Sequence, residues 1–364
     1  MTLFSDDPRP SSTRRRAWVG PTVLFSGVAL IVGLGIAPAP YVIEQPGPVF
    51  DTLGADGDVP LISIPDRTTY PTSGTLDMLT VSVVGNPQSL PNWLEIASAW
   101  FDRTKAVVPV AQIFPPSTTV EQRDQVNQAE MTDSQQEAIA AALTHLGYPV
   151  TQRVSVAQIP DGSPSTGVLQ QGDQILAVGP TTVSDVPSLR AAVQAAGTGT
   201  PVALTIERSG AQQQVQVTPT EVDGVAVLGI GAGSAFSFPF EVDIRLDKVG
   251  GPSAGMMFAL GIIDKLTDGS LNGGADVAGT GTIDASGEVG AIGGIRQKLY
   301  GAKDAGARYF LAPASNCSDV VGHVPDGLDV IAVSTLDDSL AALAAIAGGD
   351  TSGLPDCGSV TSSD

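Results

Sequence analysis

The sequence has little of what metal and nucleotide sites need. Its 364 residues include two cysteines and two histidines, with no Cys-x-x-Cys, no His-Glu-x-x-His and no His/Cys cluster. Zinc sites are built from such ligands at such spacings. The Gly-x-x-x-x-Gly-Lys-Ser/Thr loop that cradles nucleotide phosphates is also missing. We therefore expect no metal site and no cofactor, and the sequence excludes a P-loop ATPase module.

Basic residues are scarce as well. The chain has 18 Lys and Arg against 38 Asp and Glu, a net charge of −20, and most of this charge follows the first fifty residues. Nucleic acid and anionic lipid surfaces would both be repelled by such a chain. Nucleic acid is therefore excluded as a partner.

Charge is absent altogether from residues 17–43, which are mostly apolar. About 20 such residues are enough to cross a bilayer, and positive residues tend to stay on the cytoplasmic side. Arg14, Arg15 and Arg16 precede the segment. The pattern predicts a cytoplasmic tail over residues 1–16, a transmembrane helix over 17–43, and an exported remainder in a single-pass cell-membrane protein. A cleaved signal peptide remains the alternative.

Both cysteines, Cys317 and Cys357, lie on the side predicted to be exported. Disulfides persist outside the cytoplasm, so we expect the two to pair. The bond would tie a flexible tail, residues 349–364, to the preceding domain. Two free thiols are the alternative.

The middle of the chain divides into two parts. Residues 44–130 form a Pro-rich, mixed membrane-proximal region with a strand signal over 80–84. From Thr132, which forms a capping-box spacing with Gln135, a helix is predicted to Leu146, and strands and one helix follow. With the segment "GVLQQGDQILAVG", residues 131–221 resemble a PDZ domain. The resemblance implies capture of an extended peptide beside a strand; a simple spacer is the alternative.

Residues 222–348 show an α/β pattern. Strands are predicted over 240–246, 275–283, 309–312 and 330–333, and helices after residue 253 and over 295–305 and 336–347. The glycines of residues 229–233 resemble a dinucleotide loop but lack its spacing, and no helix follows them.

The stretch Gly-Gly-Pro-Ser-Ala-Gly at residues 250–255 precedes an apolar run. We predict a turn that enters a helix, with Pro252 at the first helical position. The free backbone N–H groups of Ser253 and Ala254 would then bind an oxyanion. Ser253 is the candidate nucleophile, and it needs a base.

Two kinds of base are available to this serine. Gly-x-Ser-x-Gly followed by His323 has the chain order of α/β-hydrolases, but His323 lies in a predicted surface turn and His145 on a predicted surface helix. Lys298 instead lies at the edge of the apolar stripe of its helix, between two alanines. Burial lowers a lysine's pKa, which yields the neutral amine that a base requires. A lysine whose stem packs while its head reaches water is the alternative.

"GGPSAG" and "ADVAGTGTIDASGEVGAIGGIRQKLYGAKDAGARYFLAP" resemble the proteolytic domain of the Lon family, Ser/Lys-dyad peptidases, over about residues 225–348. The resemblance implies Ser253 as nucleophile, Lys298 as general base and Thr280 as a supporting residue that contacts the lysine. Where many Lon proteins have an acidic residue three positions before the serine, this chain has Gly250.

The whole layout resembles the membrane-anchored Lon-like PDZ proteases. The expected fold class is α+β multidomain, with a transmembrane helix, a PDZ domain and a Lon-type α/β proteolytic domain. The expected function is ATP-independent serine endopeptidase activity on unfolded or flexible exported proteins, which the PDZ domain captures. The PDZ domain could equally gate the active site by covering it. A homo-oligomer is a further expectation. The alternative is a non-catalytic, membrane-tethered PDZ adaptor.

Overall fold

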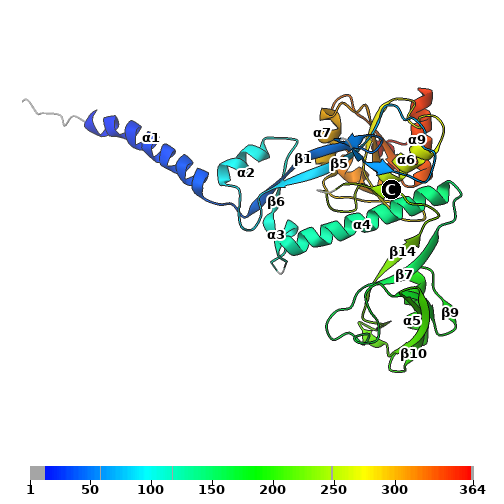
Figure 1. Ribbon diagram of the computed structural model, residues 1–364. Helices are drawn as coiled ribbons and strands as arrows, with labels where there is room; N and C mark the ends of the chain where they lie inside the picture. The colour runs from blue at the N-terminus through cyan, green and yellow to red at the C-terminus, as the bar shows by residue number, and fades with distance from the viewer. Residues whose placement is uncertain (1–12, 58, 117, 247–248, 362–364) are drawn as a thin grey trace, which may run out of the picture.

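The computed structural model describes residues 13–57, 59–116, 118–246 and 249–361, and the side chains of the first helix from residue 23 onward. Figure 1 shows a projecting amino-terminal helix, an α/β body and a smaller β-rich unit. The chain is therefore a mixed α/β multidomain protein.

A six-stranded mixed sheet forms the centre of the body. In order across the sheet, its strands are β20 (Asp329–Val333), β19 (Tyr309–Pro313), β16 (Asp276–Gly279), β5 (Thr75–Val84), β1 (Tyr41–Asp51) and β6 (Ala106–Pro109). The first four run parallel, and β1 is antiparallel to both β5 and β6. Residues 44–130, which the sequence sets apart as a mixed region, thus supply strands to the same sheet as residues 276–333.

Helices cover both faces of this sheet. One face carries α4 (Val120–His145), α6 (Gly255–Leu266) and α9 (Leu336–Gly348), and the other carries α7 (Ile295–Asp304), α8 (Cys317–Val320) and α10 (Cys357–Thr361). Successive strand residues point to opposite faces. Accordingly, Val277 and Leu311 pack in the core around α6, whereas Ala278 and Phe310 pack in the core around α7.

Shorter elements complete the described body and its edges. They are α2 (Trp93–Trp100), α3 (Val110–Ile113), η1 (Ala314–Asn316), β2 (Ala55–Asp56), β3 (Val59–Pro60), β4 (Ile62–Ser63), β15 (Asp243–Ile244), β17 (Thr282–Ile283) and β18 (Val289–Gly290). The strand predicted over residues 240–246 is reduced to β15, which pairs with β4.

The β-rich unit has its own sheet and core. Its strands run in the order β11 (Ala211–Val217), β10 (Val202–Arg208), β8 (Gln174–Val178), β7 (Thr151–Gln158) and β14 (Gly231–Ser237), with β9 (Thr181–Thr182) beside β8. Helix α5 (Val186–Ala196) contacts β14 and also β13 (Val225–Val227), which forms a hairpin with β12 (Thr220–Val222). Strand β14 differs from expectation: it lies in residues assigned to the last domain, yet it pairs with β7.

Helix α4 begins at Val120, thirteen residues earlier than a capping box at Thr132 predicts. The capping box is formed by Thr119 and Gln122, and the Thr132 hydroxyl donates instead to the carbonyl of Gln128 inside the helix. A helical Ser or Thr often bonds back to the preceding turn in this way. The predicted capping box at Thr132 and Gln135 is therefore wrong, because both residues lie in the interior of a longer helix.

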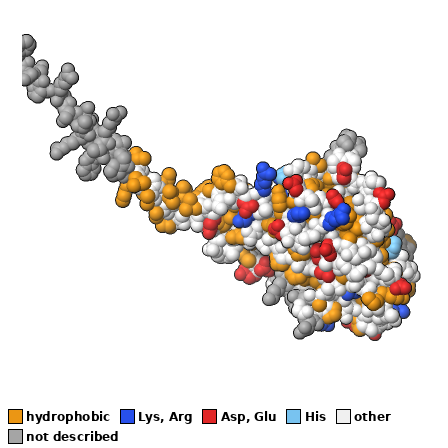
Figure 2. All heavy atoms as spheres, turned by 90° about the horizontal axis from the view of Figure 1, so that it is seen from above, with side chains coloured by type: hydrophobic (Ala, Val, Ile, Leu, Met, Phe, Trp, Pro, Cys, Tyr) orange, Lys and Arg blue, Asp and Glu red, His pale blue; other side chains and the backbone are white. Residues whose placement is uncertain are grey.

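The amino-terminal helix α1 (Thr13–Ile36) projects from the body, and hydrophobic side chains gather along it in Figure 2. Among the residues whose side chains are described, no helix is long and apolar enough to cross a membrane. The predicted span over 17–43 also differs in extent. Pro38 and Pro40 follow the end of α1 at Ile36, and residues 41–43 already belong to β1.

The carboxyl-terminal residues fold back onto the body. Cys357 in α10 is bonded to Cys317 in α8 across 40 residues of sequence, and both side chains are buried. The amide of Ala332 in β20 donates to the carbonyl of Pro355. Residues 354–361, placed by the sequence in a flexible tail, thus pack against the sheet edge and α8; residues 362–364 lie outside the described part.

Candidate active site

Ser253 lies in a turn just before α6. Gly251 in this turn has φ +87°, a left-handed conformation that favours glycine. The helix begins at Gly255 with Ala254 as its N-cap, so Pro252 precedes the helix rather than occupying its first position. The Ser253 carbonyl accepts two hydrogen bonds, from the Gly281 amide at 3.0 Å and from the Thr280 hydroxyl at 2.9 Å. These bonds fix the backbone of the nucleophile candidate.

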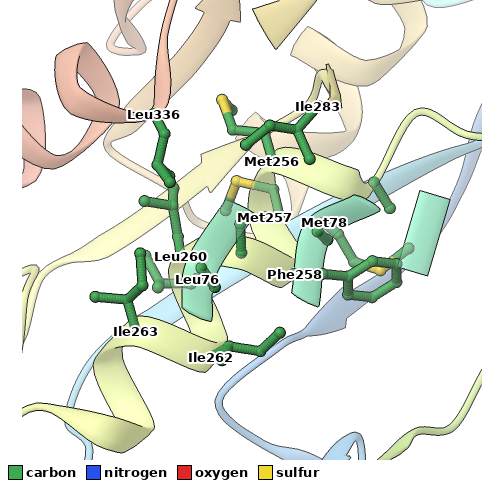
Figure 3. Packing of buried hydrophobic residues seen from close by; sticks show 14 of the residues in the cluster. Leu76, Met78, Met256, Met257, Phe258, Leu260, Ile262, Ile263, Ile283 and Leu336 are labelled. Carbon is green, nitrogen blue, oxygen red and sulfur yellow. The ribbon is translucent and has the colours of Figure 1, made fainter. Parts of the chain in front are cut away.

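Helix α6 is a rigid support for this turn. Ten of its twelve residues are buried, and Figure 3 shows Met256, Met257 and Phe258 packed among side chains from β5 and β17. A helix that is apolar all round is stable only inside a core. Gly255 at its start has no room for a side chain, because a Cβ there would lie 2.9 Å from Ser134 Oγ and 3.2 Å from the Ile283 amide nitrogen.

Lys298 reaches the serine from α7, on the opposite face of the sheet. Its side chain is 2% exposed, and its Nζ lies 2.7 Å from Ser253 Oγ and 2.9 Å from Thr280 Oγ1. Burial lowers the pKa of Lys298 to about 7. Desolvation disfavours the ammonium, and within the described ranges no carboxylate forms an ion pair with it. A large share of this lysine is therefore a neutral amine at neutral pH.

Thr280 organises the contact between lysine and serine. It follows β16 directly and is 1% exposed. Its hydroxyl donates its single proton to the Ser253 carbonyl, which leaves its oxygen free to accept from Lys298. An N–H of Lys298 is thereby directed to Thr280, and the lone pair of the neutral amine can face Ser253 Oγ.

Hydrogen-bond donors for a substrate carbonyl are present in the same turn. The amide of Gly255 donates to Pro252 and that of Met256 to Gly281. The amides of Ser253 and Ala254 have no acceptor within the described part of the chain. These are the two donors that the sequence analysis predicts for binding an oxyanion, and they remain available to a ligand.

A groove of about 880 Å³ runs past Ser253 and Lys298. One wall is residues 78–83 of β5, and another is α4 through Arg123, Asn127 and Met131. Strand β16 pairs with β5 through residues 75–78 alone, whereas β1 pairs with β5 as far as residue 84 on the other side. In the described structure, residues 79–83 therefore present an unpaired strand edge to the groove.

The histidine alternative does not fit this geometry. His323 lies in an exposed turn where its Nδ1 contacts the carbonyl of Val321, and His145 contacts Asp337 at the surface. Neither residue lines the groove. Among the described residues, no group of three or more His, Cys, Asp or Glu side chains is placed to hold a metal ion.

Three groups on α4 were missed by the sequence reasoning. The Asn127 carbonyl accepts from the Gly251 amide at 2.8 Å, the Ser134 hydroxyl donates to the Pro252 carbonyl at 2.9 Å, and Arg123 lines the groove. Ser134 lies outside the apolar stripe formed by Ile139, Leu143 and Leu146, so helical periodicity does not predict its burial. No local signal in the sequence relates α4 to a turn more than a hundred residues away.

Residues 247–345 match the Lon protease C-terminal proteolytic domain, and residues 121–218 match the PDZ domain. The Lon protease of Azospirillum brasilense is 40% identical over 94 residues, and an archaeal Lon protease of Methanocaldococcus jannaschii is 40% identical over 91. Each match covers 25% of this chain and 11% or 13% of the relative, so the chain spans a small part of their length.

Among solved structures, the PDZ domain of an SdrC-like protein from Listeria monocytogenes is 21% identical. It covers 22% of this chain and 86% of that chain with a TM-score of 0.21. The matches to Lon proteases support a serine peptidase. The chain contains a Lon protease C-terminal proteolytic domain and a PDZ domain.

Proposed function

We propose that this protein is an ATP-independent serine endopeptidase in which Ser253 and Lys298 form the catalytic dyad. The observation that carries the proposal is the 2.7 Å contact between Lys298 Nζ and Ser253 Oγ, with the lysine buried and its pKa lowered to about 7. A serine is a weak nucleophile without a base, and a neutral amine at this distance is such a base.

The proposed reaction consists of acylation of Ser253 and hydrolysis of the acyl-enzyme, and each half has two proton transfers. Lys298 takes the Ser253 proton as Oγ attacks the peptide carbonyl, and the amides of Ser253 and Ala254 donate to the oxyanion. The protonated lysine then gives this proton to the leaving amine, which leaves an acyl-enzyme. In the second half Lys298 takes a proton from water, the resulting hydroxide attacks the ester, and the proton returns to Ser253 Oγ.

The shape of the groove supports an extended peptide as substrate. The unpaired edge of β5 at residues 79–83 offers backbone donors and acceptors to an added strand, directly beside the dyad. Folded proteins keep their backbone paired internally, so we propose that unfolded or flexible chains are cleaved.

The PDZ domain is proposed to capture these chains. A cavity of about 700 Å³ lies between α5, through Val186, Leu189 and Val193, and residues 228–232 at the start of β14. Strand β14 is the last strand of its sheet, so one of its edges is unpaired in the described sheet. A peptide added to this edge would lie beside α5. Gating of the active site by the PDZ domain is the alternative role.

The decisive test is hydrolysis of casein and of unstructured peptides without ATP. Ser253→Ala and Lys298→Met are expected to lower kcat at least ~100-fold, because each removes a group that acts in the transition state. Lys303→Met is the matched control, since Lys303 lies on the same helix and its head is at the surface. Equal activity in all four proteins contradicts the dyad, and inactivity in all four favours the adaptor alternative.

We also propose that the domains act outside the cytoplasm, as expected from the sequence. The Cys317–Cys357 disulfide supports this location, because disulfides persist in oxidising compartments. Alkylation of intact cells with a membrane-impermeant thiol reagent, before and after reduction, tests the proposal. A homo-oligomer stays a prediction.

A further inference from the structure

Gly250 leaves no space for a side chain. An added Cβ at this position would lie 2.7 Å from the Cβ of Asn127, 3.2 Å from its carbonyl carbon and 3.3 Å from its carbonyl oxygen. Two of these three contacts are backbone atoms of α4, which cannot move as the tip of a flexible side chain can. Any residue with a side chain at 250 therefore displaces either α4 or the turn that carries Ser253.

The close approach of α4 forms two hydrogen bonds to the turn. The Asn127 carbonyl accepts from the Gly251 amide at 2.8 Å, and the Ser134 hydroxyl donates to the Pro252 carbonyl at 2.9 Å. Gly251 and Pro252 are the two residues directly before Ser253. Helix α4 therefore holds the amino-terminal side of the turn, while Thr280 and Gly281 hold the Ser253 carbonyl on the other side.

The helix is itself firmly held. Residues 138–143 of α4 are buried, and the helix packs against α6 in the main core of the body. Ser134 lies one turn before this buried stretch and is 4% exposed. A side chain on a rigid element holds its partner more precisely than one on a loop does.

We infer that α4 sets the position of the nucleophile, with Ser134 as a positioning residue and Gly250 as the position that gives the helix access to the turn. This inference rests on the proposed role of Ser253. Gly250 is then not a degenerate site that lost a carboxylate. Gly250 instead allows the turn to pack closely against α4, a helix that lies outside the Lon-type match at residues 247–345.

The inference makes a specific kinetic prediction for Ser134→Ala. A nucleophile displaced by a fraction of an ångström reacts more slowly in every complex, so kcat is expected to fall by ~10-fold or more while KM changes little. The apparent pKa of the rate should stay where it is in the unaltered protein, because Ser134 does not contact Lys298. A variant that merely lowers the folded fraction would instead lower the titrated active-site concentration, with kcat per active site unchanged.

The experiment uses the full chain with a peptide substrate, and an acylating serine reagent counts the active sites. Thr132→Ala is the matched control, because the Thr132 hydroxyl bonds within α4 and does not reach the turn. If Ser134→Ala matches Thr132→Ala in kcat per active site, the inference is overturned. If Ser253→Ala hydrolyses the peptide as fast as the unaltered protein does, the proposed function itself is contradicted, and not only the inference about α4.

A second pair of variants tests Gly250 independently. Gly250→Asp would supply the carboxylate of many Lon proteins, and we expect it to lower kcat by at least ~10-fold because it displaces α4. Gly250→Ala should act in the same direction. Gly348→Ala, at a helical glycine with open space around it, controls for the change from glycine to alanine. Activity that is unchanged or raised in Gly250→Asp would overturn the inference.

Discussion

Thr280 and Ser253 are joined by a hydrogen bond in which the threonine hydroxyl donates to the serine's own carbonyl oxygen at 2.9 Å. The same hydroxyl oxygen lies 2.9 Å from Lys298 Nζ. One small side chain therefore contacts both the backbone of the proposed nucleophile and the side chain of its proposed base. Neither contact involves the serine hydroxyl, so Thr280 leaves that group free for a substrate.

Thr280→Val removes both contacts while keeping the shape of the side chain. We expect kcat to fall ~10- to 100-fold, because the lysine loses the acceptor that orients it and Thr280 no longer supports the turn. Thr280→Ser keeps the hydroxyl and should retain most of the activity. Steady-state hydrolysis of a peptide by the three proteins checks this, and equal rates for the valine and serine variants would contradict it.

Activity should depend on pH through Lys298. Burial lowers its pKa to about 7, and below this value the lysine is an ammonium that cannot accept the serine proton. The rate is therefore expected to rise between about pH 6 and pH 8 and then level off. Measurement of kcat/KM across this range tests the prediction. A profile that is still rising steeply above pH 9 would show an ordinary, solvated lysine.

Stability should change with pH for the same reason. Above about pH 7 the folded protein holds Lys298 neutral, whereas the unfolded chain keeps this lysine protonated up to its ordinary pKa of about 10.4. The unfolded state then binds more protons, so the contribution of Lys298 to the free energy of unfolding rises with pH across this window. Urea unfolding of the unaltered protein and Lys298→Met should differ most below pH 7, with the variant more stable, and converge as pH rises.

Arg123 is expected to influence which peptides are cleaved. It lines the groove on α4, where its guanidinium lies 4.5 Å from the centre of the Phe114 ring. A cation at this wall attracts an acidic substrate side chain by roughly 1 kcal/mol or less where solvent screens it. Arg123→Gln should therefore raise KM for peptides with an Asp near the scissile bond by a few-fold and leave matched Asn peptides unchanged. Equal effects on both peptides would contradict this role.

The disulfide should stabilise the fold without affecting the dyad. Closing a loop of 40 residues is worth about 3 to 4 kcal/mol in the chain-entropy model, and neither cysteine lines the groove. Reduction is expected to lower the Tm and to leave kcat of the remaining folded protein unchanged. Calorimetry with and without reductant tests this, and a Cys317→Ser/Cys357→Ser protein should not respond to reductant.

Sequence reasoning named the members of the proposed dyad but not the residues that surround them. Ser253, Lys298 and Thr280 were named from a turn, a helical stripe and a family resemblance, and the structure brings them within hydrogen-bond distance. Periodicity also found α7 and α9 to within about a residue. These features are local, or they are carried by a continuous stretch of matching sequence.

What the sequence could not reveal depends on contacts between distant segments. Ser134 and Pro252 are 118 residues apart, and hydrophobic patterning predicts neither the burial of Ser134 nor its partner. The alternation over residues 80–84 did indicate a strand, yet nothing local indicated that β5 would pair with β16, whose paired residues lie 201 positions later in the sequence. Register and neighbours are tertiary properties of such short strands.

The order of the strands along the chain has a consequence for how the enzyme is made. Strands β1 and β5 are translated before the PDZ sheet, and β16, β19 and β20 after it, so the PDZ domain is inserted within the sequence of the catalytic sheet. During synthesis the PDZ domain can fold first as a unit, while the first strands wait for their parallel partners. Ser253 and Lys298 both follow the PDZ sheet in the sequence, so on the proposed function the nascent chain would complete its PDZ sheet before the proposed active site can assemble.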